Sequence, residues 1–329
     1  MQVKQTENFG GLPQLVLGGA TLNTQYNDDP YSLPVEEMLK YAFSHGITAI
    51  DTSPYYGPSE MIFGKSLESI RAEWPRDSYS IFTKVGRVQL DDFDYSREHV
   101  RKSVLRSCER LRTDYLDVLY LHDIEFVEEN MIFEALTEMK KLKDEGVVLR
   151  FGISGYPVDF LYQIAKKCKD IETIGPLDNI LSYCNLNLQN LTLEKYYNKL
   201  TEECMVKTVS NGSILSMSLL TAGETKPFHP CSSELRERCS SAAKFLADEG
   251  IDIADLATKY AICHWLQRGP TVLGCSDVVE VEHAFKNYKE LIENGGLTKR
   301  EQDLVTHVQE NILGELMNST WDSGIPGRR

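Results

Sequence analysis

The sequence predicts an α/β fold in which eight parallel strands and their helices close into one (β/α)8 barrel, a TIM barrel, over residues 1–329. Short apolar, β-branched segments alternate with longer segments whose apolar residues recur at helical spacing. Strands that alternate with helices favour parallel pairing through right-handed crossovers, and eight such units close a barrel. No linker, tandem repeat or low-complexity tract divides the chain, so we expect a single domain.

The elements follow one another in strand-then-helix order. The predicted strands are residues 14–18, 47–52, 79–84, 116–121, 147–154, 178–183, 213–217 and 271–274. The predicted helices are residues 34–45, 59–72, a helix from Ser96 to about Leu111, and residues 128–145, 158–167, 191–205, 232–249 and 278–293. Ser59 is a candidate N-cap. The helix after Ser96 is expected to bury Val100, Val104, Leu105, Cys108 and Leu111. Residues 221–231 are predicted to form a long loop over the strand ends, and the tail from Thr298 a packing helix.

The composition of the chain argues against some classes of binding partner. The net charge of −14 and the pI near 5.0 argue against a nucleic-acid or anionic-membrane partner, because both carry like charge. No run of 18 or more apolar residues and no basic-then-apolar leader is present, so we expect no membrane span. The eight cysteines form no C-x-x-C pair and fit no zinc spacing, which predicts reduced thiols, no metal site and a cytoplasmic protein.

Titratable side chains end three neighbouring predicted strands. Asp51 closes the second strand and Tyr56 follows it, Lys84 closes the third, and His122 closes the fourth. The functional groups of β/α barrels are mounted on the loops after the strands. We therefore expect these four side chains to converge.

The segments D-T-x-x-x-Y-G at 51–57, T-K-V-G at 83–86 and L-H-D at 121–123 resemble the aldo-keto reductase superfamily. Y-G-P-S-E and L-S-Y-C resemble its branch of sugar dehydrogenases, the L-galactose and D-arabinose 1-dehydrogenases. The resemblance spans about residues 12–313 and includes the order of the strands.

The resemblance implies a role for each of the four residues. Tyr56 would exchange the hydroxyl proton that must move when hydride leaves a carbinol carbon. Lys84 would favour the phenolate, since a nearby cation lowers a phenol's pKa, and Asp51 would keep that ammonium charged. His122 would orient the reacting oxygen. Tyr55 and Asp123 are expected in the substrate pocket.

No G-x-G-x-x-G opens a helix, so a Rossmann grip on a dinucleotide is not supported. By resemblance, the residues expected to hold the dinucleotide are Gly19, Thr21, Ser154, Ser216, Ser218, Leu220, Gly274, Ser276 and Glu280. Backbone amides of the Ser218 segment would meet the pyrophosphate.

Three positions depart from the family pattern. Gly155 stands where the family has Asn, and Ile180 where it has Gln. Asn179 offers an amide, but its side chain is expected on the face opposite to Ile180. Met217 stands where many relatives stack an aromatic ring on the nicotinamide.

The segment expected to bind adenosine is acidic. Asp277, Glu280 and Glu282 lie there, and no Lys or Arg occurs between 269 and 285. A 2′-phosphate would meet uncompensated negative charge, whereas a ribose hydroxyl can donate to a carboxylate such as Glu280. We therefore expect NAD as the cofactor, which favours the dehydrogenase direction because cellular NAD is mostly oxidised.

The expected reaction is oxidation of the anomeric hydroxyl of a cyclic aldose to its lactone. D-arabinose is the first choice, its lactone being of the kind that feeds erythroascorbate synthesis, and L-galactose and L-fucose stay open. The alternatives are an NAD(P)H-dependent aldehyde reductase and a slow dinucleotide-binding regulatory subunit. The sequence leaves the oligomeric state open.

Overall fold

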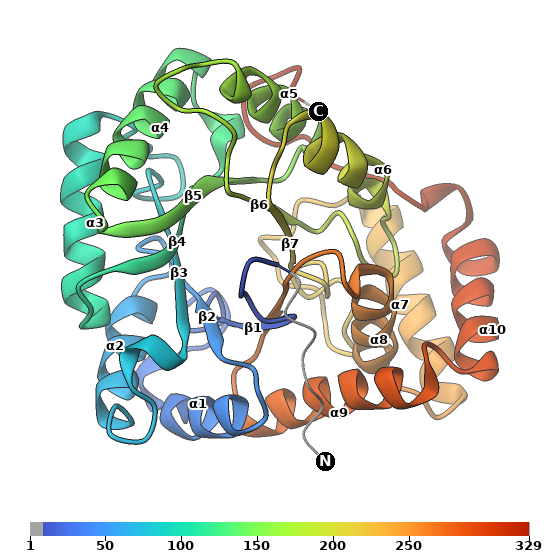
Figure 1. Ribbon diagram of the computed structural model, residues 1–329. Coiled ribbons are helices and arrows are strands. Elements are labelled where there is room, and N and C mark those ends of the chain that lie inside the picture. The colour runs from blue at the N-terminus through green and yellow to red at the C-terminus, as the bar shows by residue number, and fades with distance from the viewer. Residues whose placement is uncertain (1–8, 329) are drawn as a thin grey trace.

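The computed structural model describes residues 9–328, which form a closed barrel of eight parallel strands in sequential order (Figure 1). This confirms the predicted (β/α)8 barrel. The strands are β1 Leu15–Gly18, β2 Ala49–Asp51, β3 Ser80–Val85, β4 Leu116–Leu121, β5 Val148–Gly155, β6 Asn179–Tyr183, β7 Thr208–Gly212 and β8 Thr271–Gly274.

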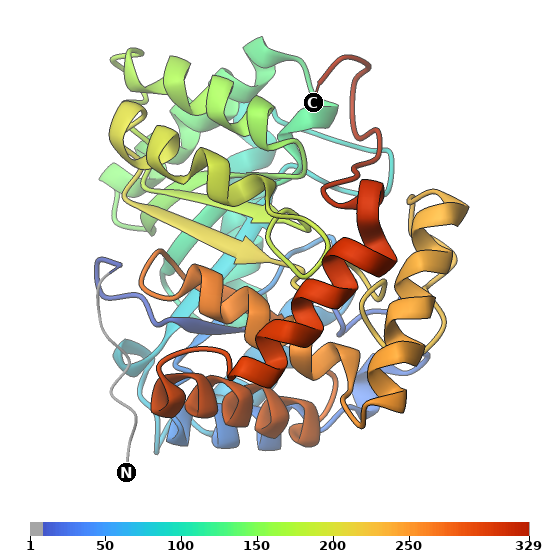
Figure 2. The ribbon, with the colours of Figure 1, turned by 90° about the vertical axis from the view of Figure 1, so that its right-hand side faces the viewer.

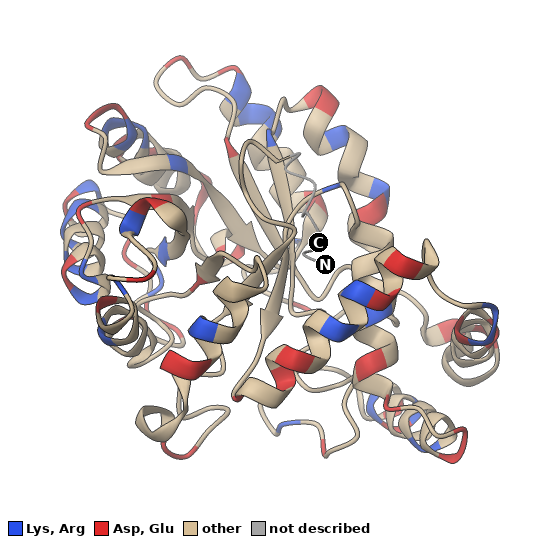
Figure 3. Ribbon diagram, turned by 60° about the horizontal axis from the view of Figure 1, so that its bottom comes forward, with Lys and Arg blue, Asp and Glu red and all other residues tan. Residues whose placement is uncertain are grey.

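Helices surround the barrel on its outside, with acidic and basic residues interspersed along them (Figures 1 and 3). The α-helices are α1 Val35–Ser44, α2 Ser59–Ser69, α3 Arg97–Leu111, α4 Glu129–Asp144, α5 Val158–Lys169, α6 Thr192–Asn198, α7 Ser233–Asp248, α8 Ile253–Trp265, α9 Val278–Asn294 and α10 Lys299–His307. Short 3-10 or π turns are η1 Pro30–Ser32, η2 Arg76–Ser78, η3 Ile124–Phe126, η4 Lys199–Glu203, η5 Val308–Leu313 and η6 Gly314–Leu316. No helix among residues 9–328 is both long and apolar enough to cross a membrane.

The side chains of each strand alternate between the barrel interior and the helices. Ala49, Phe82 and Tyr120 belong to a small cluster inside the barrel, whereas Ile81 and Leu119 pack with the surrounding helices. Because the side-chain period of a strand is two, the residues two positions further along the interior series also face inward. Those residues are Asp51, Lys84 and His122, at the carboxyl ends of β2, β3 and β4.

The predicted seventh strand was wrong. The strand is Thr208–Gly212, and the predicted segment 213–217 lies after it. Ser210 and Asn211 leave this segment without an apolar run, so its sequence does not resemble a buried strand. Both side chains are nonetheless fully buried, Ser210 inside the barrel and Asn211 on the outer face, where its amide donates to Leu186 O at 2.9 Å. The segment that follows bends instead, because Ser213 and Ser216 have positive φ angles.

Three helix expectations also need correction. Helix α8 was missed, although Asp252 caps its N-terminus and Ile253, Leu256 and Ala257 begin a buried face. Ser59 does not cap α2, whose N-cap is Pro58; its hydroxyl donates to Gly19 O at 3.0 Å instead. Leu105 is exposed, whereas the other four predicted residues of α3 are buried.

The chain beyond Thr298 does form the predicted packing helix. Thr298 and Glu301 make a capping box at the start of α10, and η5 continues the rod against α7 (Figure 2). Residues 317–328 then run along the rim past the loops after β6, β5 and β4, where Ile325 N donates to Glu125 O at 2.9 Å. Residues 323–328 thus lie beside η3 and α5.

Candidate active site

The four residues predicted to converge do so at the carboxyl end of the barrel. Lys84 Nζ lies 2.5 Å from Asp51 Oδ1 and 3.0 Å from Thr52 O, and both Lys84 and Asp51 are buried. The same ammonium lies 4.8 Å from the centroid of the Tyr56 ring. The ring of Tyr56 meets that of His122 edge-on at 5.8 Å.

The Tyr56 phenol is more weakly acidic than the sequence led us to expect. Burial raises its pKa well above the ordinary value of 10.0, and the carboxylates of Asp51 and Asp123 raise it further. Arg87 opposes this shift. The expected lowering of the pKa by Lys84 is therefore not seen, because burial outweighs the neighbouring cations.

His122 is a neutral imidazole near pH 7. Burial lowers its pKa well below 6.5, and the positive charges of Lys84 and Arg87 lower it further. Its Nδ1 lies 3.1 Å from Ser53 Oγ, which already accepts the Tyr55 N–H at 3.1 Å. The Ser53 hydroxyl proton is thus available to Nδ1, an arrangement that favours the proton of the imidazole on Nε2.

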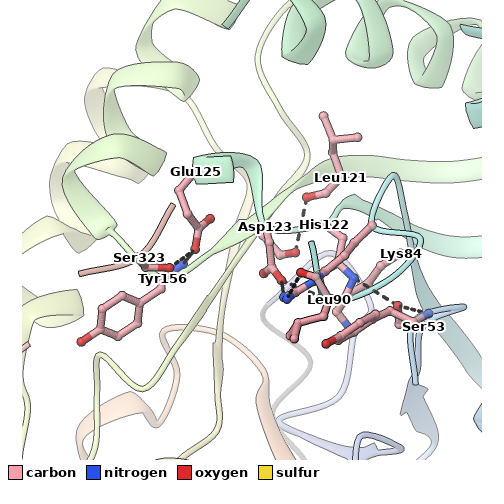
Figure 4. Close-up of polar contacts among 12 residues, drawn as sticks. Ser53, Lys84, Leu90, Leu121, His122, Asp123, Glu125, Tyr156 and Ser323 are labelled. Atoms are coloured by element: carbon pink, nitrogen blue, oxygen red, sulfur yellow. Dashed lines mark hydrogen bonds and ion pairs between the residues drawn. The ribbon is translucent and has the colours of Figure 1, made fainter. Parts of the chain in front are cut away.

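Arg87 is a site residue that sequence reasoning missed. It follows β3, forms an ion pair with Asp123, and stacks its guanidinium 4.2 Å from the centroid of the Tyr55 ring. Asp123 Oδ2 lies 3.5 Å from His122 Nε2. Figure 4 shows Asp123 and His122 side by side, with Lys84 and Ser53 next to them. The two residues predicted for the substrate pocket, Tyr55 and Asp123, therefore both adjoin the four central residues.

Glu125 explains one departure from the family pattern. A Cβ on Gly155 would overlap Glu125 Oε2, so no larger residue fits at position 155 while that carboxyl is in place. Glu125 Oε1 accepts the Tyr156 N–H at 3.0 Å and the Ser323 hydroxyl at 3.0 Å, as Figure 4 shows. The carboxyl thus fills the space of the missing side chain and joins β5 to the end of the chain.

Three of the predicted dinucleotide residues line the strand ends. Ser154 is buried on the inward face of β5 and donates to Leu121 O at 3.3 Å. Thr21 donates to Cys275 O at 2.6 Å, which joins the loop after β1 to the loop after β8. Gly19 has a packing role, because a Cβ there would overlap Phe63 of α2.

The segment after β7 is a tight series of turns. Ser216, Met217 and Ser218 all have positive φ angles, of 49°, 48° and 81°. Leu219 N donates to Ser216 O at 3.0 Å and Leu220 N to Leu215 O at 3.1 Å, so these two amides already form hydrogen bonds within the turns. Of the predicted amides of Ser218, Leu219 and Leu220, only that of Ser218 makes no hydrogen bond within residues 9–328. The expectation that all three amides face the pyrophosphate is therefore not met in this structure.

The predicted loop at residues 221–231 is fastened to these turns. Cys231 N donates to His229 Nδ1 at 3.1 Å, so Nε2 carries the proton and donates to Ser216 O at 2.9 Å. Lys226 N donates to Ser218 Oγ at 2.8 Å. The loop therefore lies directly over the turns.

Two carboxylates, those of Asp277 and Glu280, lie at the loop after β8 and the start of α9. Glu280 Oε2 accepts the Ser276 N–H at 2.6 Å, and Asp277 caps α9 by accepting the Glu280 N–H. Gly274 ends β8 and is exposed. A basic residue from another loop, Lys226, comes close to this acidic segment. Its Nζ donates to Tyr26 O at 3.3 Å, and the neighbouring Asn27 donates to Ser276 Oγ.

Asn179 and Ile180 lie on opposite faces of β6, as expected, but Asn179 and not Ile180 faces the barrel interior. Ile180 packs with the outer helices, so it cannot take the place of a Gln that faces the barrel mouth. Asn179 lies on the inward face of β6, fully buried. Its register partner on β5 is Gly152, two residues before Ser154.

No group of three His, Cys, Asp or Glu residues within 9–328 is arranged to hold a metal ion. All eight cysteines are unpaired.

Comparison with known proteins matches these features to one family. Residues 14–294 match the aldo/keto reductase family. A D-arabinose 1-dehydrogenase of Saccharomyces cerevisiae is 55% identical over 321 residues, covering 97% of this chain and 96% of its own. An L-galactose dehydrogenase of Arabidopsis thaliana is 36% identical over 290 residues, covering 87% and 86%.

Solved structures agree at the level of the fold. An aldo-keto reductase from Bacillus halodurans in its holo form has a TM-score of 0.67 at 21% identity, over 95% of each chain. A glycerol dehydrogenase from Gluconobacter oxydans has a TM-score of 0.66 at 21% identity, also over 95% of each chain. The chain therefore belongs to the aldo/keto reductase family of oxidoreductases, which bind a nicotinamide dinucleotide.

Proposed function

We propose that this protein oxidises the anomeric hydroxyl of a cyclic aldose to the lactone, with NAD as the hydride acceptor and D-arabinose as the preferred sugar. The observation that carries the proposal is the grouping of Tyr56, Lys84, Asp51 and His122 at the barrel mouth. The similarity to sugar dehydrogenases over nearly the whole chain supports the substrate class.

In the proposed reaction Tyr56 takes the proton of the anomeric hydroxyl. Lys84 lies beside its ring and stabilises the phenolate as it forms, while Asp51 neutralises the buried ammonium. His122 donates from Nε2 to the same substrate oxygen, because its neutral form with Nδ1 on Ser53 leaves Nε2–H free. The dinucleotide, when bound, supplies the acceptor for the hydride.

Residues at the mouth fit a dinucleotide without a 2′-phosphate. Glu280 and Asp277 stand at the N-terminus of α9, where a phosphate would otherwise be favoured by the helix dipole. Their carboxylates repel a phosphate group and can accept a ribose hydroxyl. Ser154 and the Ser218 amide remain candidates for the nicotinamide and pyrophosphate.

The raised pKa of Tyr56 supports one rival. A phenol that stays protonated is a ready proton donor, which suits the reduction of an aldehyde. The two directions differ in substrate range, since only an aldose dehydrogenase needs a cyclic sugar.

The decisive experiment follows the absorbance of reduced nicotinamide over a panel of aldoses with NAD. We expect D-arabinose to give the highest kcat/KM, ahead of L-galactose and L-fucose. In parallel, aromatic aldehydes are tested with the reduced dinucleotide. Efficient aldehyde reduction without sugar oxidation would establish the reductase instead, and the absence of any sustained turnover would favour a regulatory subunit.

A further inference from the structure

Asp123 is held in an uncommon backbone conformation beside the reacting centre. Its φ angle of 56° lies in the left-handed region, which Asp and Asn tolerate better than most other residues. This conformation turns the side chain back toward His122, so that Oδ2 lies 3.5 Å from His122 Nε2. The carboxylate thus adjoins the imidazole nitrogen that faces the substrate oxygen.

Arg87 fixes the other side of this carboxylate. Its Nη1 donates to Asp123 Oδ2, and its Nη2 donates to Leu90 O at 2.9 Å. The guanidinium also lies 5.3 Å from the centroid of Phe93 and 5.4 Å from that of Phe126. A planar cation enclosed by aromatic rings and bonded at two nitrogens has little freedom to move, so the position of Asp123 is well defined.

One oxygen of Asp123 remains available. Within residues 9–328 its Oδ1 makes no hydrogen bond or ion pair, and it is not among the fully enclosed polar atoms that lack a partner. Asp51 differs: its Oδ1 bonds Lys84, but its Oδ2 is fully enclosed and unpartnered. Asp51 is therefore buried against Lys84 and inaccessible to a substrate, whereas Asp123 has an accessible acceptor oxygen next to His122.

The proposed function rests on one hydroxyl at the reacting carbon, and an aldose carries a second on the neighbouring carbon. Oxygens on adjacent sugar carbons lie close enough to bind two adjacent protein groups. We infer that Asp123 accepts a hydrogen bond from the hydroxyl at sugar carbon 2 while His122 contacts the reacting oxygen, which restricts the site to 2-hydroxy aldoses. Arg87 is the positioning residue that orients Asp123. This inference rests on the proposed sugar oxidation.

The size of the effect follows from the chemistry of the contact. A hydrogen bond to a charged group contributes about 10- to 100-fold in binding, and a site built around it rejects an analogue that lacks the hydroxyl. The unfilled carboxylate would then be left desolvated in a buried site. The discrimination should therefore appear in kcat/KM.

The first measurement uses the unaltered protein and two sugars. 2-Deoxy-D-ribose is D-arabinose without its carbon-2 hydroxyl, so the pair differs in one oxygen only. We expect kcat/KM with NAD to be about 10- to 100-fold higher for D-arabinose. If neither sugar is oxidised, the proposed function fails. If both are oxidised equally well, the function stands and the role of Asp123 is overturned.

The second measurement uses variants, compared by the ratio of kcat/KM for the two sugars. Asp123→Asn keeps the shape and tolerates the positive φ angle, and Arg87→Met removes the positioning cation. We expect the ratio to fall in Asp123→Asn, because the neutral amide oxygen accepts a weaker hydrogen bond than a carboxylate, and to fall less in Arg87→Met. Asp91→Asn is the matched control: this carboxylate is exposed in the loop after β3, and its ratio should equal that of the unaltered protein.

A general structural defect would slow both sugars equally and leave the ratio unchanged. That outcome in Asp123→Asn overturns the inference. Thermal unfolding of each variant shows whether the fold is retained. If the variants do not fold, the comparison of D-arabinose with 2-deoxy-D-ribose in the unaltered protein tests the inference by itself.

Discussion

Glu125 Oε1 accepts a hydrogen bond from the hydroxyl of Ser323 at 3.0 Å, which ties the end of the chain to the loop after β4. Trp321, two residues earlier, stacks on Tyr156 with ring centroids 4.4 Å apart and an interplanar angle of 10°. Arg328 donates to Val127 O and lies 4.4 Å from the centroid of Phe160. The last segment of the chain is thus an integral part of the wall beside the active site.

Glu125 makes the stability of the protein depend on pH. Burial, and then repulsion by Asp123, raises its pKa from 4.5 to about 8 in the folded state. The folded state therefore holds this proton more tightly than the unfolded chain, and the contribution to the free energy of unfolding is complete below about pH 4. It is lost as the pH rises toward 8, at up to roughly 1.4 kcal/mol per pH unit.

Glu125→Gln should remove this part of the pH dependence, since an amide keeps the acceptor for Tyr156 and Ser323 but does not titrate. Chemical unfolding at intervals from pH 5 to 9 measures it, and the variant should gain stability relative to the unaltered protein as the pH rises. Glu128→Gln is the control, because Glu128 is an exposed carboxylate in the same loop. This variant should keep the original dependence of the free energy of unfolding on pH. Parallel curves for Glu125→Gln and the unaltered protein would contradict the prediction.

Gly324 is required where the tail meets η3. It has a φ angle of 77°, and a Cβ there would overlap the carbonyl of Glu125. Gly324→Ala should therefore release the tail, seen as faster proteolysis beyond residue 316 and as altered Trp fluorescence from Trp321. Gly327→Ala is a matched control, because its φ angle is 93° but nothing lies within 4 Å of the added Cβ. Equal proteolysis of the two variants would show that backbone strain alone, and not the overlap, is responsible.

Tyr56→Phe should abolish sugar oxidation, because the phenyl ring fills the same space but cannot exchange a proton. The affinity for the dinucleotide, measured by fluorescence titration, should stay nearly intact. Tyr41→Phe changes the same chemical group on α1, outside the barrel mouth, and should retain turnover. Retention of a tenth of the activity in Tyr56→Phe would remove this residue from the acid/base role.

The carboxylate of Glu280 should lower the use of NADP. In Glu280→Gln the ratio of kcat/KM for NADP over NAD is expected to rise by about two- to fivefold, the effect of one partly exposed charge. Glu282→Gln removes a charge from the same helix at an exposed position without a contact to Ser276, and should change the ratio less. Equal or better use of NADP by the unaltered protein would refute the proposed NAD preference, and Lys226 would then be the first residue to test.

Much of the fold was predictable because most strands and helices have a characteristic pattern of apolar residues in their own sequence. Strands β2 to β5 combine apolar runs with turn residues, and they were predicted within a residue or two. Strand β7 was not predicted because its polar residues Ser210 and Asn211, although both are buried, leave no apolar run that would identify a strand. The apolar residues after it, such as Ile214, belong to turns with positive φ angles, which no apolar pattern reports.

Local order along the chain was enough to bring Asp51, Lys84 and His122 together. Each lies at the carboxyl end of a parallel strand, two residues after a side chain that faces the barrel interior. Because side chains alternate along a strand, all three therefore face the interior as well. The pairing of Arg87 with Asp123, the carboxyl of Glu125 beside Gly155 and the return of Ser323 to η3 had no such signal. They depend on loop conformations and on contacts across up to 198 residues, which form only when the closed barrel brings its loops to one rim.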